Sequence, residues 1–162
     1  MTVSDASPLM NLAAVSYLSL VRDLVGPVLI PEAVYREITD GVGLPGAREV
    51  AEADWITVES VRDRTRVTLL LDRLDLGEAE AIALALQERD AGRPTRLVVY
   101  ERKARAECDR LGLPRIGVVG LLLAGKMAGH LSEVRPVLNA LARHGFWLRR
   151  DVTAAVLRRA GE

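Results

Sequence analysis

Short apolar segments alternate along this chain with longer segments of helical periodicity, and this alternation constrains the fold more than any other feature. Residues 97–100 form a continuous apolar run that ends at a charge, which is typical of a buried parallel strand. Residues 77–90 are rich in Ala and Leu and favour a long helix. Strands that alternate with helices form βαβ units. The chain therefore predicts an α/β fold whose central parallel sheet is covered by helices on both faces.

The same periodicity places the individual elements. Residues 39–47 contain three glycines and a proline and are predicted to form a loop. Pro31 is assigned to the first position of a helix, where its missing N–H costs nothing. We expect strands at residues 2–4, 28–30, 55–59 and 97–100. We expect helices at residues 9–24, from Pro31 onward, and at 77–90, 102–111, 118–128, 132–143 and 152–160.

The composition fits one domain that folds without a covalent or metal staple. The chain has 162 residues, 49% of them hydrophobic, which supports a sizeable core. Its one cysteine, Cys108, excludes a disulfide within the chain and is expected to be a buried apolar residue. With only His130 and His144 beside it, a zinc site is not expected. No apolar run reaches the roughly 18 residues of a membrane helix and no signal peptide is evident, so we expect a cytoplasmic protein.

The net charge is zero, but the charges are unevenly distributed. Residues 1–99 carry 10 Lys/Arg and 16 Asp/Glu, a net charge of −6. Residues 100–162 carry 12 Lys/Arg and 6 Asp/Glu, a net charge of +6. Tight non-specific binding to nucleic acid needs a larger positive excess. An acidic patch beside a basic one is compatible with a metal site that meets a phosphate backbone, and equally with two ordinary solvated faces.

Two acidic residues directly follow predicted strands. Asp5 comes after the strand at residues 2–4, and Glu101 comes after the strand at residues 97–100. In open α/β sheets, ligands bind beyond the carboxyl ends of the strands, so neighbouring strands would point both carboxylates at one crevice. Asp5 has a second interpretation as the N-cap of the helix that starts near Pro8, because Asp is a favoured N-cap residue.

Another acid lies on the helix that starts at Pro31. Glu37 projects between Ala33 and Val34, on the side of the helix that packs inward. A carboxylate there is costly unless something binds it, so Glu37 either binds a ligand or lies at the edge of the apolar stripe and reaches water. Glu32 and Arg36, by contrast, are four residues apart and can pair on the polar face.

The long Ala-rich helix carries two acids in its first turn. Glu78 shares a direction with the apolar positions of this helix, whereas Glu80 lies on the polar side. Face geometry therefore selects Glu78 over Glu80, although the helix dipole favours acids at both positions. Asp75 or Gly77 caps the helix, and neither Asp72 nor Asp75 is included in the predicted site.

Together these acids form a plausible cage for Mg²⁺ or Mn²⁺. Asp5, Glu37, Glu78 and Glu101 come from four separate segments and carry the oxygen ligands that hard cations prefer. Crowded carboxylates raise each other's pKa, so the cluster is destabilised until a cation enters. A bound metal would orient a water molecule, lower its pKa and neutralise charge on a scissile phosphate. No Ser–His–Asp or Cys–His arrangement offers a rival nucleophile.

Basic residues follow Glu101 and recur at the C-terminus. Arg102, Lys103 and Arg105 are candidates for contacts with substrate phosphates, or they form a solvated helix face. The C-terminal segment meets RNA, a partner or only water, and its apolar positions predict that the last helix packs on another part of the molecule. The arginines of this segment are Arg143, Arg149, Arg150, Arg158 and Arg159.

Several segments together resemble the PIN-domain proteins, in the branch long catalogued as a domain of unknown function and compared with VapC-type toxins. The likeness covers nearly the whole chain and implies a three-layer α/β/α domain over residues 1–162, with a helical extension at about 130–162. It also implies an endoribonuclease that depends on Mg²⁺ or Mn²⁺, acting as a homodimer that a small antitoxin protein silences. The matching segments are residues 3–9 (VSDASPL), 30–38 (IPEAVYREI), 76–85 (LGEAEAIALA), 101–105 (ERKAR), 117–121 (GVVGL) and 145–148 (GFWL).

By position, the resemblance also assigns the metal site. Glu80 matches an acid of this branch as well as Glu78 does, so the third ligand stays open between them. The four acids of the set and the hydroxyl that supports it are Asp5, Glu37, Glu78, Glu101 and Ser7.

The chain departs from this branch directly before the basic residues. The branch usually has Asp-Asp before Arg-Lys, whereas this chain has Tyr100-Glu101. Glu is longer by one methylene, which shifts the metal position and puts a second metal, and the activity, in question. One alternative is therefore a catalytically weakened module that binds nucleic acid or a protein partner without cleavage. Another is a doubly wound regulatory or small-molecule domain with Asp5 as a receiver-type acid, although residues 117–120 lack the ending of a phosphate-binding loop.

Overall fold

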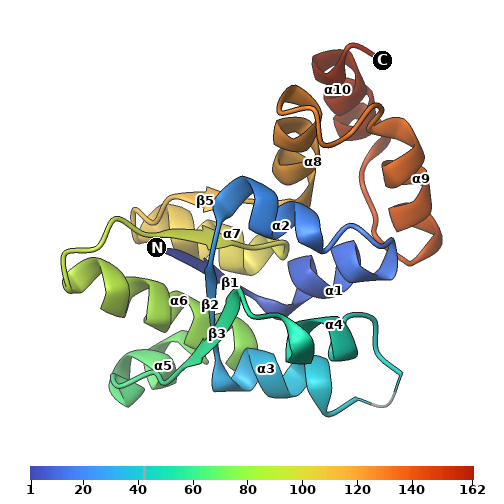
Figure 1. Cartoon of the computed structure of the whole chain (residues 1–162). Helices are drawn as coiled ribbons and strands as arrows, with labels where there is room; N and C mark the ends of the chain where they lie inside the picture. The colour runs from blue at the N-terminus through green and yellow to red at the C-terminus, as the bar shows by residue number, and fades with distance from the viewer. Residues whose placement is uncertain (42) are drawn as a thin grey trace.

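The computed structural model describes residues 1–41 and 43–162 and contains one sheet of parallel strands (Figure 1). The strand order is β3-β2-β1-β4-β5, and every neighbouring pair is parallel. Val3 of β1 lies opposite Leu29 on one side and Leu97 on the other, so β1 is central. The strands are β1 (Thr2–Ser4), β2 (Val28–Pro31), β3 (Ile56–Glu59), β4 (Arg96–Val98) and β5 (Arg115–Ile116).

Helices cover both faces of this sheet. On one face α6 (Leu76–Asp90) packs across β1, β2 and β4, with α5 (Arg64–Leu70) and α7 (Arg102–Arg110) against it. The other face carries α1 (Ala6–Ala14) and α2 (Ser19–Val25), which pack on α8 (Val118–Met127). This arrangement confirms the expected three-layer α/β/α fold. None of the helices in the described part of the chain is long and apolar enough to cross a membrane.

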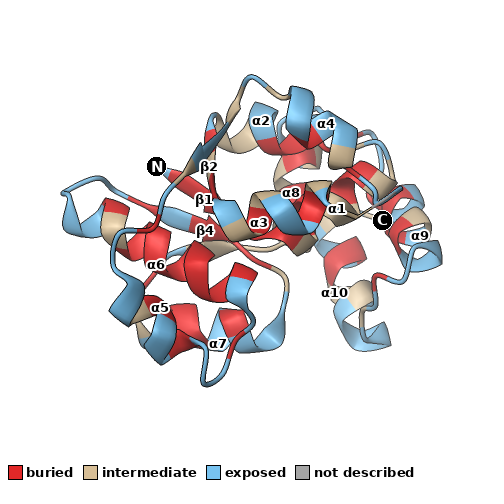
Figure 2. Ribbon diagram, turned by 90° about the horizontal axis from the view of Figure 1, so that it is seen from below, coloured by how far each residue is buried: buried red, intermediate tan, exposed pale blue. Residues whose placement is uncertain are grey.

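The centre of the core is α6, which is buried along most of its length (Figure 2). Alanines on this helix allow it to lie close to the sheet, where Val3, Ile30 and Leu97 are fully buried. The buried apolar residues form one cluster that reaches from the sheet to the C-terminal helices. Cys108 on α7 belongs to this cluster, as predicted for a buried apolar residue. Burial raises the pKa of its thiol to about 12.

Three predicted boundaries are wrong. The helix expected at residues 9–24 is two helices, because Ser16 adopts a left-handed conformation with φ of 63° and turns the chain between α1 and α2. Pro31 is the last residue of β2 and the N-cap of α3 (Glu32–Thr39), with ψ of 165°, so the helix begins one residue later than predicted. Strand β4 also ends at Val98, two residues before the predicted end.

The sequence analysis missed three short elements, namely α4 (Ala47–Glu52), α5 and β5. The predicted loop at residues 39–47 ends where α4 begins, and its residue 42 lies outside the described residues. The two helices not yet described were predicted to within three residues at each end. They are α9 (Arg135–Arg143) and α10 (Arg150–Ala160).

The last three helices are tied together by Glu162. Its Oε1 accepts hydrogen bonds from Lys126 Nζ at 2.7 Å and from the backbone N–H of Val134 at 2.7 Å. Its Oε2 accepts a hydrogen bond from the backbone N–H of Arg135 at 2.9 Å, at the start of α9. Lys126 and these two N–H groups lower the pKa of Glu162 to about 2. The carboxylate therefore joins the end of α8 to the start of α9 and to the segment that follows α10.

Candidate functional site

The candidate site lies where the strand order of the sheet reverses. From β1 the chain continues to β2 on one side, whereas β4 and β5 lie on the other, so the crevice at the carboxyl ends of β1 and β4 is a topological switch point. Asp5 occupies this place, and its backbone N–H donates to the carbonyl of Val98 at 3.0 Å. The sheet itself therefore fixes the residue that the sequence analysis placed first.

Asp5 is 3% exposed, and its carboxylate is not used to cap a helix. Asp5 is the N-cap residue of α1, but its side chain makes no capping hydrogen bond to the helix. The pKa of Asp5 is raised to about 7, mainly by burial and further by the negative charges of Glu78, Glu37 and Asp75, while the Ala6 N–H opposes the shift. The capping interpretation of Asp5 is therefore not supported.

Glu78 is the second buried acid of the site, at 6% exposed. It forms a capping box at the start of α6: its backbone N–H donates to Asp75 Oδ1 at 2.9 Å, and its Oε2 accepts from the Asp75 N–H at 3.3 Å. Burial raises the pKa of Glu78, and the charges of Asp75 and Glu101 raise it further, against the opposing effects of the Asp75 N–H and Lys103. Two buried carboxylates, one directly after β1 and one in the first turn of α6, thus repel each other.

Glu37 approaches the same helix start from α3. Val34 and Ile38 are the buried residues of α3, so Glu37 lies at the edge of the apolar stripe, as the second of the two alternatives predicted. Its carboxylate nevertheless leans on α6: a Cβ placed on Gly77 would lie 2.7 Å from Glu37 Oε2. Burial of this end of the side chain, together with the charge of Asp75, raises the pKa of Glu37. The absence of a side chain at Gly77 makes room for the carboxylate.

Asp75 belongs to the cluster although the sequence analysis left it out. Its charge raises the pKa of Asp5, of Glu37 and of Glu78. The prediction that Asp75 caps α6 is confirmed, and the cap brings its carboxylate to the same point. An acid at the N-cap, three residues before a glutamate, is the sequence signature of a capping box. That spacing is visible in the sequence and is the signal that places Asp75 beside Glu78.

Two open hollows flank the cluster, and Asp75 lines both. The hollow on the α3 side has a volume of about 800 Å³ and is lined by Glu37 and Gly77 among others. The hollow on the α7 side has a volume of about 1020 Å³ and is lined by Glu78 and Glu101. A ligand therefore reaches Glu37 from one side and Glu78 from the other, whereas Asp5 is buried behind them and lines neither hollow.

The α7 hollow collects most of the other predicted residues. Glu101 is exposed at the N-cap of α7, and its charge reaches Glu78 across the hollow. Arg102 and Lys103 line the same wall, whereas Arg105 is exposed one turn further along the helix. Ser7 is half-buried in the first turn of α1, two residues after Asp5. Basic and acidic side chains thus face one opening.

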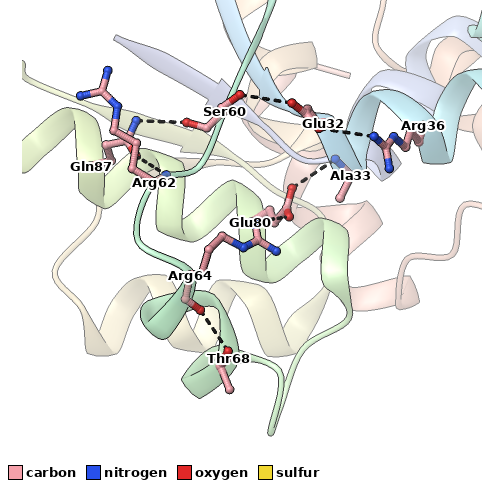
Figure 3. A network of polar contacts seen from close by, with 9 residues as sticks. All are labelled: Glu32, Ala33, Arg36, Ser60, Arg62, Arg64, Thr68, Glu80 and Gln87. Carbon is pink, nitrogen blue, oxygen red and sulfur yellow. Dashed lines mark hydrogen bonds and ion pairs between the residues drawn. The ribbon is translucent and has the colours of Figure 1, made fainter.

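Glu80 is differently placed from the other acids (Figure 3). Its side chain is 6% exposed and therefore does not lie on a polar face of α6. The sheet, α3, α5 and α7 all pack against this helix, so it has no solvated face near its start. Its Oε1 pairs with Arg64 Nη1 at 2.6 Å, and its Oε2 accepts from the Ala33 N–H at 3.2 Å, in the first turn of α3. The expected polar-side position of Glu80 is therefore wrong, and its carboxylate holds α3 and α5 on α6.

Other buried acids of the core are also paired with arginine. Arg93 donates to both oxygens of Glu88, at 2.6 and 2.8 Å, and lowers the pKa of this carboxyl. Arg110 and Arg73 do the same for Glu107. No such cation pairs with Asp5 or Glu78 in the part of the chain that the structure describes.

The donor chemistry of the cluster suits a divalent cation, but the side chains do not form a closed cage. All the candidate ligands are carboxylates, which Mg²⁺ and Mn²⁺ prefer over nitrogen or sulfur. Among residues 1–41 and 43–162, no three His, Cys, Asp or Glu side chains converge closely enough to hold an ion. The exposed Glu37 and Glu101 side chains are the ones free to close on a cation from the two hollows.

Comparison with known proteins gives one match. The family model described as DUF3368, PIN domain, matches residues 1–162. No curated protein and no solved structure matches the chain.

Proposed function

Because the chain belongs to the PIN-domain family, whose members are generally nucleases, we propose that it is a metal-dependent endoribonuclease. The observation that carries the proposal is Asp5. A buried carboxylate with three acidic neighbours and no cationic partner among the described residues is costly, and a bound cation removes that cost. Asp5 lies at the switch point of the sheet, where α/β proteins bind their ligands.

In this proposal Mg²⁺ or Mn²⁺ is held by Asp5, Glu78 and the exposed carboxylates of Glu37 and Glu101. The pairing of Glu80 with Arg64 favours Glu78 as the α6 ligand. A bound metal supplies an activated water molecule and neutralises charge on the scissile phosphate. The protein residues hold the ion and orient the RNA backbone.

The basic rim of the α7 hollow suits a phosphate backbone. Arg102 and Lys103 line the hollow beside Glu101, so they are placed to neutralise phosphates on either side of the cleaved bond. Arg105, further along α7, extends this positive surface. Ser7, next to Asp5 in the first turn of α1, is assigned to support of the metal site.

We extend the proposal to a cellular role through the resemblance to VapC-type toxins. In this role the chain is the toxin of a toxin–antitoxin pair in the cytoplasm, acts as a homodimer, and is silenced by a small antitoxin protein. The support for this part is the resemblance alone. The family match leaves the receiver-type interpretation of Asp5 without support.

A specific observation favours the second candidate, a module that binds RNA without cutting it. The branch has an acid at position 100, whereas here Tyr100 packs its ring 4.7 Å from that of Phe146 and donates its hydroxyl to the Trp147 carbonyl at 3.4 Å. Position 100 therefore supports the fold and supplies no carboxylate. Only Glu101 remains at this corner, and it is exposed.

Cleavage of single-stranded RNA with Mn²⁺ or Mg²⁺ distinguishes the candidates. The enzyme proposal expects cleavage that EDTA abolishes and that Asp5→Asn loses. Glu88→Gln is the matched control, because it removes a carboxylate that is as buried as Asp5 but paired with Arg93. Cleavage that survives EDTA or Asp5→Asn contradicts the proposal, and metal binding without cleavage supports the module.

A further inference from the structure

The connection between α9 and α10 presents an aromatic ring to solvent. Trp147 is 71% exposed, while its neighbour Phe146 is 4% exposed and anchored in the core. The segment is thus fixed at Phe146, with the indole held outside. Exposed tryptophans are uncommon, since the ring carries a large apolar area, and they often mark a surface that binds a partner.

Trp147 is connected to the acidic site through Tyr100. The Tyr100 hydroxyl donates to the backbone carbonyl of Trp147 at 3.4 Å, and its ring packs on Phe146 at 4.7 Å with an interplanar angle of 32°. Tyr100 directly precedes Glu101, which lines the α7 hollow. The aromatic segment is therefore docked on the end of β4, beside the residues that open the proposed metal site.

A small hollow beside the indole adds a pocket to this surface. It has a volume of about 230 Å³ and is mainly apolar, but Asn139 and Thr153 place an amide and a hydroxyl at it. Thr153 donates its hydroxyl to the Arg149 carbonyl at 3.1 Å, so its oxygen remains an acceptor. An apolar wall with a few hydrogen-bonding groups suits a flat heteroaromatic ring with a polar edge.

The surrounding charge identifies the class of ligand. Residues 143–150 carry three arginines and no acid, and Arg102 and Lys103 follow Tyr100 and Glu101 on the other side. Arg149 pairs with Asp151, and both side chains are largely exposed. An exposed aromatic ring among cations is the arrangement by which proteins hold single-stranded nucleic acid, with the base on the ring and the phosphates on the cations.

We propose that Trp147 is a stacking platform for a base of single-stranded RNA, next to the nucleotides that meet the acidic cluster. The proposal rests on the proposed function for its choice of RNA and adds the residue that holds the strand beside the acidic cluster. Duplex RNA is excluded from the platform because its bases are already stacked on one another.

Binding without metal tests the platform separately from cleavage. In EDTA, Trp55→Phe leaves Trp147 as the one tryptophan of the chain, and a single-stranded RNA oligonucleotide is expected to quench its fluorescence. Trp147→Ala should weaken the Kd for this oligonucleotide between about 5- and 150-fold, whereas Trp147→Phe, which keeps an aromatic face, should stay within about threefold. The thermal midpoint of each variant shows that it is folded.

Leu69→Ala is the matched control, because Leu69 is 70% exposed on α5, at the opposite end of the molecule from α9 and α10 (Figure 1). It should leave the Kd unchanged. An unchanged Kd in Trp147→Ala, an unquenched Trp147 signal on binding, or equal affinity for duplex RNA overturns the proposal. So does a loss of self-association in Trp147→Ala, which would assign the ring to a second copy of the chain. Trp147-dependent binding without cleavage in Mn²⁺ supports the platform and contradicts the enzyme, whereas full cleavage by Trp147→Ala at unchanged KM does the reverse.

Discussion

The carboxylates of the core fall into two regions that are equally buried and electrostatically opposite. Asp5 and Glu78 are 3% and 6% exposed, while Glu88 and Glu107 are both 5% exposed. Arginines lower the pKa of Glu88 and Glu107, whereas burial and neighbouring acids raise the pKa of Asp5 and Glu78. Burial alone therefore does not identify a functional acid. The charge of the neighbouring groups does: an arginine partner marks a structural acid, and acidic neighbours mark a candidate ligand.

The difference also separates two uses of charge. The paired acids fasten elements to each other, as Glu107 fastens α7 to the turn that carries Arg73. The unpaired acids join no two elements by an ion pair, and the ionised Asp5 leaves the folded chain less stable than it would be with an amide in its place. Four predictions test this division.

The largest expected effect is the loss of cleavage in Asp5→Asn. The amide has the same shape but cannot neutralise a cation, so the rate of RNA cleavage in Mn²⁺ should fall at least about 100-fold. Single-turnover cleavage by gel electrophoresis measures it. A rate close to that of the unaltered chain would place Asp5 among the structural acids instead.

The second-largest effect is expected from a comparison of two acids on α6, Glu78 and Glu80. Glu78→Gln should reduce metal affinity and cleavage strongly with little loss of stability. Glu80→Gln should leave metal affinity unchanged and lower the free energy of unfolding by about 1 kcal/mol, since it breaks the ion pair with the half-exposed Arg64. Calorimetric titration with Mn²⁺ and urea unfolding measure the two quantities, and the reverse pattern would make Glu80 the ligand.

The pH dependence of stability should have the sign that a raised pKa imposes. Below pH 4 Asp5 is protonated in both the folded and the unfolded chain and contributes nothing. Between pH 4 and about 7 only the unfolded chain ionises, so stability falls as the pH rises, by about 2–4 kcal/mol in total. Thermal melts in EDTA at pH 5 and pH 8 test this.

Two comparisons isolate the contribution of Asp5 in these melts. Asp5→Asn should melt at a higher temperature than the unaltered chain at pH 8, and this difference should be clearly smaller at pH 5. Saturating Mn²⁺ should restore stability at pH 8, because the metal binds the ionised form. Melts in which Asp5→Asn is less stable at pH 8 would contradict the raised pKa.

The smallest effect is expected from Gly77→Ala. The new Cβ lies 2.7 Å from Glu37 Oε2, so the carboxylate must move while the fold tolerates the change, and Ala favours the helix. Metal affinity should fall about 10-fold with stability nearly unchanged. In a Glu37→Gln background the same substitution should have no further effect on affinity. An equal loss in both backgrounds would show that Gly77 acts on something other than Glu37.

The fold was largely predictable because its strongest patterns are local. Strand β1 and helix α6 follow from apolar runs and from Ala-rich periodicity, and Asp5 follows from its place after a strand. The break at Ser16 was not predictable, because a left-handed serine has no sequence signature comparable to glycine. Helices α4 and α5 are too short to show a periodicity of their own.

Site residues were predictable where their position along the chain determines their surroundings. They were not predictable where tertiary packing determines those surroundings. Glu80 was assigned to a polar side because α6 was treated as a surface helix, but a helix packed on several sides has no polar face to detect. Asp75 was set aside as a cap, although capping is what carries its charge into the cluster. The contact between Tyr100 and Phe146 joins positions 46 residues apart and leaves no local pattern.

The place of β1 in the sheet also determines when during folding the acids meet. Asp5 and Glu78 are 73 residues apart in the chain, so they meet only after a long loop has closed, which is a slow step for a parallel sheet. The repulsion between these acids is therefore absent from the early, local stages of folding and acts on the completed sheet. A bound cation should consequently act more on the rate of unfolding than on the rate of folding, lengthening the lifetime of the folded chain.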